Sequence, residues 1–203
     1  RSTVAHRAGL ALRPLVDEWV ELLWWSLKKM APQLQRKPRM PKVWVSCDVD
    51  APYSPGSKSW PLAMRQTASD LWNHRSPRQA GRTLLNAVAS RLGITRFDPY
   101  DTFEWMLNAN ENSGNRVSFF FLSVLKPAHI DGCYELGEPR IWQLMRSILQ
   151  RGHEIGLHGS YASADQPDKL ANELGRLRLA ILQAGGDPSR IGGRQHYLRW
   201  RMD

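Results

Sequence analysis

The sequence predicts an α/β protein built on a parallel sheet, either an open sheet or a (β/α) barrel. Short apolar runs alternate with helical patterns along residues 43–197, in the order strand, helix, strand, helix, strand, helix, strand. The clearest run, residues 117–122, is almost continuously apolar, which is typical of a parallel strand covered on both faces. Polar clusters follow three of these runs, where parallel α/β folds collect their ligand-binding residues.

The composition predicts one domain preceded by a helical segment. The 203 residues are 42% hydrophobic, which is enough for a single sizeable core. We assign residues 1–35 to an N-terminal helical segment and residues 36–203 to the α/β domain. The chain begins with Arg1 rather than Met and stops at Asp203 directly after a motif, so we expect both ends to be cut.

The N-terminal segment contains a predicted helix that begins at Pro14 and ends before Pro32. Leucine, valine and tryptophan recur in it at helical spacing and form one apolar stripe. Crowded apolar positions of this kind usually belong to a core, so we assign Trp19 to packing. The basic run that follows, residues 36–42, is broken by prolines and lacks interleaved aromatic residues, and we interpret it as a solvated linker.

The other elements follow from the same sequence patterns. Residues 51–60 hold two prolines, a glycine and three serines and are expected to form a loop. The expected strands are residues 43–45, 117–122, 154–157 and 190–197. The expected helices cover residues 78–92 and the segments that begin at Thr102, Pro139 and Pro167.

Charge and cysteine content limit the partners and the compartment. The formal net charge of +9 suits a polyanion, but the basic residues are scattered, so we predict no nucleic-acid partner and keep a nucleic-acid-binding protein only as an alternative. No apolar run approaches the ~20 residues of a membrane span, and no signal-peptide pattern is present. Cys47 and Cys133 show no CxxC spacing, so reduced thiols and a cytoplasmic location are the default expectation.

Three polar clusters stand at the expected strand ends and contain three of the six histidines. They are Cys47–Asp50, Arg151–Tyr161 and Arg194–Tyr197. In the first cluster, Asp48 and Asp50 are two residues apart, and such a pair can divide the roles of metal ligand and base. We interpret the three clusters together as one metal-centred site.

Of the two histidines in the middle cluster, His158 is the better candidate for a metal ligand. His153 and His158 are five residues apart, so in an extended segment they point to opposite faces. His158 lies at the end of the expected strand beside Gly159. His153 and Glu154 are interpreted as structural or supporting residues, with Glu154 able to hydrogen-bond a ligand histidine.

These motifs give the chain a resemblance to the NodB-type polysaccharide deacetylases, a carbohydrate esterase family, and within it to an uncharacterised bacterial branch. Asp98-Pro-Tyr-Asp-Thr-Phe103 and the Phe119-Phe-Phe121 run extend the similarity over most of residues 14–200. The three principal matches are Cys47-Asp-Val-Asp-Ala-Pro-Tyr53, His153-Glu-Ile-Gly-Leu-His-Gly-Ser-Tyr161 and Arg194-Gln-His-Tyr-Leu-Arg199.

The resemblance implies a distorted (β/α) barrel, of which about half is present here. It implies hydrolysis of an N-acetyl group on a carbohydrate, assisted by a divalent metal that we expect to be Zn²⁺. Asp48 would be the general base, Arg194 would orient it, and the backbone N–H of Tyr197 would help to bind the oxyanion. Asp50 and His158 would be metal ligands.

The chain departs from the family pattern in three places. Val49 separates two aspartates that are adjacent in the family, which leaves open which is base and which is ligand. Ala162 stands where the family has its second metal histidine, and we expect His196 to supply the third ligand instead. The family's general acid, a histidine on a late strand, has no counterpart before Asp203. A second hypothesis therefore stays open, namely a catalytically inactive barrel that binds glycan.

Five further residues have weaker functional claims. Tyr53 and Tyr161 either line a sugar site or cap the barrel. Trp60 and Trp72 can stack on a sugar ring, although loop tryptophans more often cover a core. Glu173 lies on an expected helix and is most simply a solvated charge.

Overall fold

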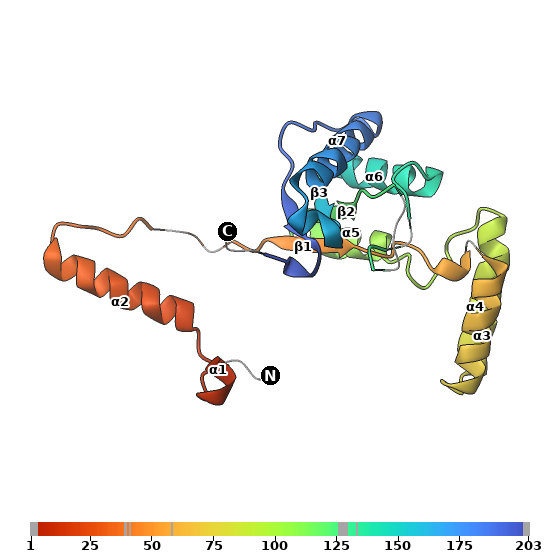
Figure 1. The fold of residues 1–203 in the computed structure, drawn as a ribbon, viewed down its shortest axis with the longest axis horizontal. Coiled ribbons are helices and arrows are strands. Elements are labelled where there is room, and N and C mark those ends of the chain that lie inside the picture. Colours follow the sequence, from red (N-terminus) through yellow and green to blue (C-terminus); the bar gives the residue numbers. More distant parts are fainter. Residues whose placement is uncertain are drawn as a thin grey trace. The chain divides into compact units, whose positions relative to one another are not determined.

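The computed structural model describes residues 4–38, 40, 42–57, 59–125, 130–132 and 134–200, and Cys133 lies outside them. The chain divides into two units, Arg1–Lys42 and Val43–Asp203, which are called unit 1 and unit 2 (Figure 1). Unit 1 contains α1 (Val4–Arg7) and α2 (Leu15–Met30). All other elements belong to unit 2.

The apolar stripe of α2 is not buried. The helix follows Pro14, as predicted, and ends at Met30, but no residue in it is buried. Trp19, which we assigned to core packing, has 69% of its surface exposed. Within the described part of unit 1 no other element packs along this helix, so unit 1 by itself does not provide the packed position that we predicted for Trp19 (Figure 1).

Unit 2 is built on a parallel four-stranded sheet whose strands follow in chain order. Its curved arrangement is that of half a barrel flanked by helices (Figure 1), which confirms the predicted α/β class with a parallel sheet. The strands are β1 (Val45–Val49), β2 (Val117–Leu122), β3 (Glu154–Gly159) and β4 (Gly193–Gln195). The helices are α3 (Trp60–Trp72), α4 (Pro77–Arg91), α5 (Phe103–Asn112), α6 (Pro139–Gln150) and α7 (Pro167–Gln183).

Local chemistry explains where these helices begin. Pro77, Pro139 and Pro167 each occupy the first helical turn, where the missing N–H of proline leaves no intrahelical bond unmade. Ser76 caps α4 by accepting a hydrogen bond from the N–H of Gln79. α5 begins directly after Thr102, as predicted, but the Thr102 side chain makes no cap hydrogen bond.

The two faces of the sheet differ because side chains alternate along each strand. One face is buried beneath α5, α6 and α7. Its strand residues include Val49, Val117, Phe119, Phe121, Ile155 and Leu157. The other face is open and carries Ser46, Asp48, Ser118 and Gly156 around the half-buried ring of Phe120. A Cβ at Gly156 would lie 2.5 Å from that ring, so the residue opposite Phe120 must be glycine. The prediction that β2 is covered on both faces is therefore wrong for Ser118 and Phe120.

Three boundaries differ from the sequence prediction. The first strand begins at Val45 rather than at 43, and Trp44, expected inside it, is exposed. The asparagines and glycine of residues 108–115 predict a break in the helix, but α5 continues to Asn112, and the Asn110 side chain donates to the carbonyl of Met106 one turn earlier. Residues 51–60 contain the 3₁₀ turn Pro55–Ser57, and α3, for which we predicted no element, follows.

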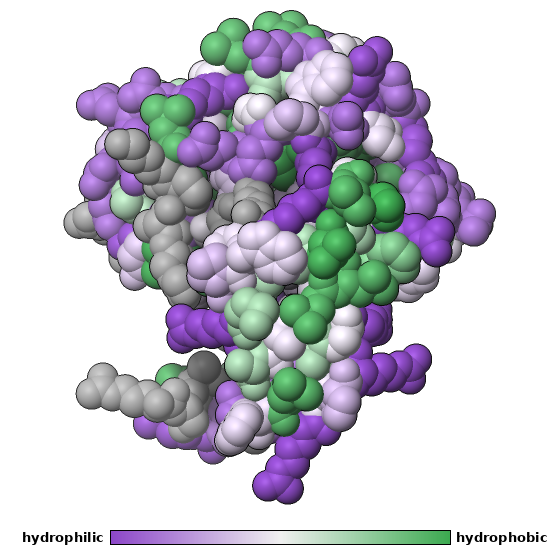
Figure 2. Space-filling view, turned by 90° about the vertical axis from the view of Figure 1, so that its right-hand side faces the viewer, coloured by the Kyte–Doolittle hydropathy of each residue, from purple (hydrophilic) through white to green (hydrophobic). Residues whose placement is uncertain are grey.

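Helices α3 and α4 pack against each other through small side chains. Ala63 and Ala87 are fully buried, and Gly56 approaches the backbone of Ala63. Larger apolar side chains such as Met64 and Val88 therefore point outward. Figure 2 shows apolar side chains exposed among hydrophilic ones over this end of unit 2.

His153 is a structural residue, as predicted. Its buried ring accepts the N–H of Val117 at Nδ1, at 3.1 Å, so Nε2 carries the proton and donates to Glu111, also at 3.1 Å. Glu111 additionally holds Arg151 through two hydrogen bonds of 2.6 and 2.7 Å. The cluster joins α5 to the starts of β2 and β3. The Arg151 bonds are the largest cause that holds the pKa of Glu111 at about 2, below its ordinary 4.5.

This depressed pKa predicts a specific acid sensitivity. A carboxyl whose folded pKa is lowered stabilises the fold above its unfolded pKa, and that contribution is lost as the pH falls toward the folded value. We expect the Glu111→Gln variant to be less stable than the parent at pH 7 and to lose less stability between pH 4.5 and about 2. Urea unfolding midpoints across that range measure both effects.

Glu104→Gln is the matched control, because Glu104 binds the same arginine by a single 2.9 Å contact and does not contact His153 in the described interactions. The Glu104→Gln variant should keep most of the loss of stability that the parent shows between pH 4.5 and about 2. If the parent and Glu111→Gln lose the same stability over this range, Glu111 is not the group responsible for the loss.

Candidate metal centre

The carboxyl ends of the strands bring Asp50, His158 and His196 together. Asp50 follows β1, His158 is the fifth residue of β3, and His196 follows β4. Nε2 of His158 lies 3.3 Å from Oδ1 of Asp50, and Nδ1 of His196 lies 3.7 Å from the same oxygen. The two ring nitrogens are 2.8 Å apart. These are the three residues that we expected to hold a metal.

Two backbone carbonyls determine which nitrogens of these histidines carry protons. A carbonyl can only accept, so Nδ1 of His158 must donate to the carbonyl of Arg194 at 3.0 Å. Likewise, Nε2 of His196 must donate to the carbonyl of Ile130 at 2.8 Å. In the neutral rings, the unprotonated nitrogens are therefore Nε2 of His158 and Nδ1 of His196. These are the two that face each other.

Two facing lone pairs at 2.8 Å repel unless a proton or a cation lies between them. Asp50 adds a carboxylate oxygen on the same side, which makes a two-histidine, one-aspartate donor set of the kind that binds Zn²⁺. For bond lengths of about 2.0–2.1 Å, the edge of a coordination tetrahedron is about 3.3 Å. The observed separations of 2.8, 3.3 and 3.7 Å lie on both sides of that value, so this donor set fits a small divalent cation.

The local electrostatics favour positive charge at this point. Burial lowers the pKa of His158, but hydrogen bonds to Asp50 and to the Arg194 carbonyl outweigh it, and the net pKa is raised. The pKa of Asp50 is lowered, chiefly by its hydrogen bond with His158. Both shifts have the same physical origin, a carboxylate next to buried imidazoles.

The second carboxylate, Asp48, has different partners. Its Oδ1 accepts from Nη1 of Arg194 at 2.9 Å, and Nη2 of the same guanidinium donates to Ser46 at 2.7 Å. The guanidinium also lies over the ring of Phe120, 4.9 Å from its centroid. The sequence left open which aspartate is ligand and which is base. The geometry places Asp50 with the histidines and Asp48 with the arginine.

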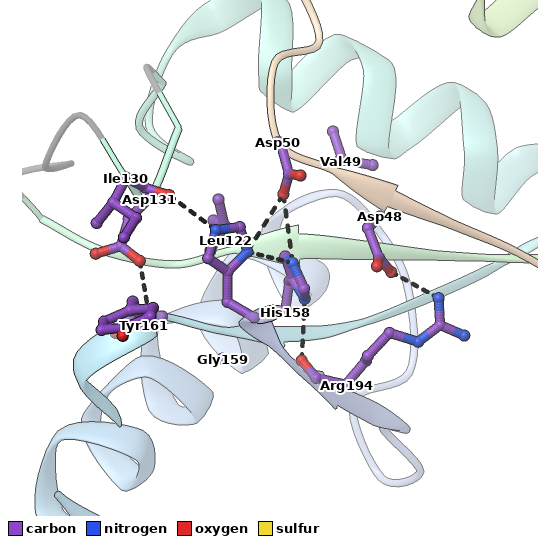
Figure 3. A network of polar contacts seen from close by, with 12 residues as sticks. Asp48, Val49, Asp50, Leu122, Ile130, Asp131, His158, Gly159, Tyr161 and Arg194 are labelled. Carbon is purple, nitrogen blue, oxygen red and sulfur yellow. Dashed lines mark hydrogen bonds and ion pairs between the residues drawn. The ribbon is translucent and has the colours of Figure 1, made fainter. Parts of the chain in front are cut away.

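Arg194 thus serves both halves of the site. Its backbone carbonyl fixes the tautomer of His158, and its side chain holds Asp48 (Figure 3). The register of the sheet permits this because His158 pairs directly with Arg194 across β3 and β4. A single residue of β4 therefore links the metal-binding donors to the second carboxylate.

Tyr197 continues the chain from His196 in a left-handed conformation, with φ 56°, and Leu198 follows with φ 51°. Non-glycine residues held in this region cost on the order of 1–3 kcal/mol each and occur often at functional sites. The Tyr197 ring lies 4.5 Å from the ring of His196 and 5.9 Å from that of Tyr161. Tyr161 and Tyr197 are 38% and 69% exposed and form an aromatic rim beside the histidines.

The segment that follows β2 holds the strand ends in place. Asp131 accepts the N–H of Tyr161 at 2.6 Å, and Gly132, with φ 85°, sits against the carbonyl of Asp50, where a Cβ would lie only 2.4 Å away. The hydroxyl of Tyr134 donates to the carbonyl of Val49 at 2.7 Å and accepts the N–H of Leu122 at 2.8 Å. These contacts fix the positions from which Asp50 and His158 project.

Glu173 is a supporting residue that the sequence prediction missed. We expected a solvated charge, but the side chain is fully buried. Its carboxylate accepts the N–H and the hydroxyl of Ser160, at 3.0 and 2.6 Å, and so anchors α7 to the end of β3. The sequence did contain a signal for this burial. Helical periodicity places Glu173 four residues before Leu177, on the side of α7 that faces the sheet.

Several other candidates do not join the site. Glu154, expected to support a ligand histidine, binds Ser118 and Arg116 at the opposite end of the strands. Tyr53 is buried against Arg140, and burial is the largest cause that raises its pKa to about 12. Trp72 is exposed on α3, and Trp60 lies under the guanidinium of Arg91.

A cavity of about 750 Å³ lies away from the three metal-binding candidates, at the starts of β2 and β3. Its lining includes Glu154 and Arg116, which form an ion pair with each other. Because this lining contains none of Asp50, His158 and His196, we place the chemistry at the opposite ends of the strands.

Comparison with protein-family models, with curated proteins and with solved structures yields no significant match. Among the described residues, no helix is long and apolar enough to cross a membrane. The case for a metal centre therefore rests on the geometry of this chain.

The donor set predicts that His196 is a metal ligand. We expect the parent chain to contain near-stoichiometric zinc, His158→Ala to lose it, and His196→Ala to lower the affinity at least about tenfold. Elemental analysis and titration against a chelator measure the content and the affinity. His74→Ala, which replaces an exposed histidine in the connection between α3 and α4, is the control and should bind like the parent. Unchanged affinity in His196→Ala would remove this residue from the donor set.

Proposed function

We propose that this chain is a metal-dependent hydrolase that removes N-acetyl groups from carbohydrate. The observation that carries the proposal is the pair of facing, unprotonated imidazole nitrogens beside Asp50, with a second carboxylate held separately by Arg194. Hydrolysis of an amide needs both parts, an electrophilic centre and a base. The motif resemblance supplies the substrate class.

The division between the two aspartates supports the assignment of roles. When a divalent cation is bound, it lowers the pKa of coordinated water to about 7 and polarises a carbonyl. Asp48, paired with Arg194 on the open face of the sheet, would accept the proton of the attacking water. The charge-assisted hydrogen bond from the guanidinium fixes the direction of this carboxylate.

The rim residues support recognition of the substrate. The exposed rings of Tyr161 and Tyr197 offer flat apolar surfaces beside the histidines, on which a sugar ring can pack. The backbone N–H of Tyr197 would stabilise the oxyanion of the tetrahedral intermediate. The proton for the leaving amine has no assigned donor among the residues of the site.

An inactive glycan-binding protein is the second candidate, and Ala162 favours it. The family pattern has a histidine at this position, and the substitution removes one expected ligand. In the proposed site His196 replaces that ligand from another strand. The second candidate would be favoured if the folded, zinc-loaded protein binds the glycan but does not hydrolyse it.

The test of the activity is release of acetate from oligomers of N-acetylglucosamine by the zinc-loaded chain. Asp48→Asn keeps the shape of the side chain and an acceptor for Arg194 but removes the base. We expect its kcat to fall about 10²–10⁴-fold with zinc content unchanged. Asp50→Asn should lower both zinc affinity and activity.

The two aspartate variants are controls for each other. Loss of zinc in Asp48→Asn, with zinc retained in Asp50→Asn, would reverse the two roles. Oligomer binding without acetate release, in parent protein that contains stoichiometric zinc, would exclude the hydrolase.

A further inference from the structure

Helix α2 of unit 1 has one broad apolar face, interrupted only by Ser26, that no other helix or strand in the described part of the unit covers. At ~100° per residue, the apolar side chains span an arc of about 160°. They include Val16, Trp19, Leu22, Leu23, Leu27 and Met30, each between 39% and 84% exposed. Asp17, Glu18, Glu21, Lys28 and Lys29 lie on the opposite side of the helix, together with Trp25.

The charge of this unit is strongly biased. Residues 1–42 contain nine lysine and arginine residues and three acidic residues, an excess of six positive charges. Two thirds of the net charge of +9 is therefore carried by about a fifth of the chain. Glu18 and Glu21 are paired with Arg13 and Arg36, so the excess positive charge belongs to the other basic residues of the unit, among them Lys28, Lys29, Lys37 and Lys42.

The combination of an apolar face and a basic surrounding indicates the chemistry of the partner. An apolar arc of leucines with one tryptophan, Trp19, is suited to the boundary between headgroups and acyl chains, where the rings of tryptophan are favoured. Each basic residue in the flanking segments strengthens binding near an anionic surface by about fivefold. The helix lies in the plane of the bilayer in this mode and does not cross it.

A second copy of the same helix is a poorer fit. A coiled coil uses a narrow seam and needs at least three to four heptads, whereas α2 has 16 residues, about two heptads. An arc of about 160° is also wider than such a seam. Six excess positive charges on each copy would repel.

We propose that unit 1 binds the surface of anionic phospholipid membranes through the apolar face of α2. Lys37 and Lys42, in the segment that follows the helix, contribute electrostatic attraction. This inference is independent of the metal centre, which lies wholly in unit 2. Membrane binding also accounts for the exposure of Trp19, which a role in core packing would not explain.

The test uses the whole 203-residue chain with vesicles of phosphatidylcholine, alone or with about 30% phosphatidylglycerol. Flotation should show binding to the anionic vesicles that weakens between about 0.1 M and 1 M salt, and little binding to the neutral ones. Trp19→Gln and Trp25→Gln form a matched pair: the same exchange in one helix, on the apolar and the polar face. The first should lower the partition coefficient by about tenfold or more, and the second by no more than about threefold.

The charge component has its own pair of variants. Lys37→Gln with Lys42→Gln should weaken anionic binding about fivefold for each charge removed. The same number of charges removed from α7, in Lys169→Gln with Arg178→Gln, should have a smaller effect. Circular dichroism and zinc content show that each variant is folded.

Four results would overturn the proposal. The first is no binding to anionic vesicles at low salt. The second is an equal loss in both tryptophan variants. The third is self-association that Trp19→Gln abolishes, without vesicle binding, which would assign the face to a second copy. The fourth is a lower melting temperature of Trp19→Gln without vesicle binding, which would assign the face to packing within the chain.

Discussion

The hydrogen bonds from two imidazole rings to two backbone carbonyls are the constraint on which the site depends. Each carbonyl can only accept, so each ring is held with one N–H toward the protein and one lone pair toward its neighbour. Without the carbonyls of Arg194 and Ile130, both rings could rotate or change tautomer. With them, the cluster needs a positive charge between its nitrogens. The distance of 2.8 Å between His158 and His196 is thus a consequence of backbone positions set by the sheet and by the segment after β2.

The fold fixes those backbone positions through its buried face. The apolar side of β2 and β3 packs under three helices, and the residues that close this packing at the strand ends are polar. Glu173 ties α7 to Ser160, and Tyr134 bridges the last residues of β1 and β2. Because these groups are buried, each lost hydrogen bond would leave an unsatisfied partner at a cost of about 1–3 kcal/mol. Rigidity at the carboxyl edge of the sheet therefore comes from side chains that do not touch the metal-binding candidates.

Sequence patterns were sufficient for the parts of the molecule that follow simple periodicity. The bounds of β2, the proline-initiated helices and the convergence of Asp50, His158 and His196 were predictable, because strand order and strand ends fix them. Contacts between distant segments were not. The carbonyl of Ile130 as a partner for His196 depends on a segment without a repeating pattern. The exposure of Trp19 was also missed, because an amphipathic helix has the same sequence pattern whether its apolar face packs on a protein core or binds another surface.

The insertion of Val49 between the two aspartates explains how one strand serves both halves of the site. Side chains alternate along β1, so Asp48 projects from the open face, where Arg194 reaches it, and Val49 is buried in the core. Asp50 comes after the last ladder pair, Val49 with Phe121, and is free to turn toward the histidines. Directly adjacent aspartates within the strand would place one carboxylate in the apolar core. The valine thus anchors the strand end and separates the carboxylate held by Arg194 from the carboxylate beside the histidines. Shortening this spacing by one residue would disrupt the core and the Asp50, His158 and His196 cluster together.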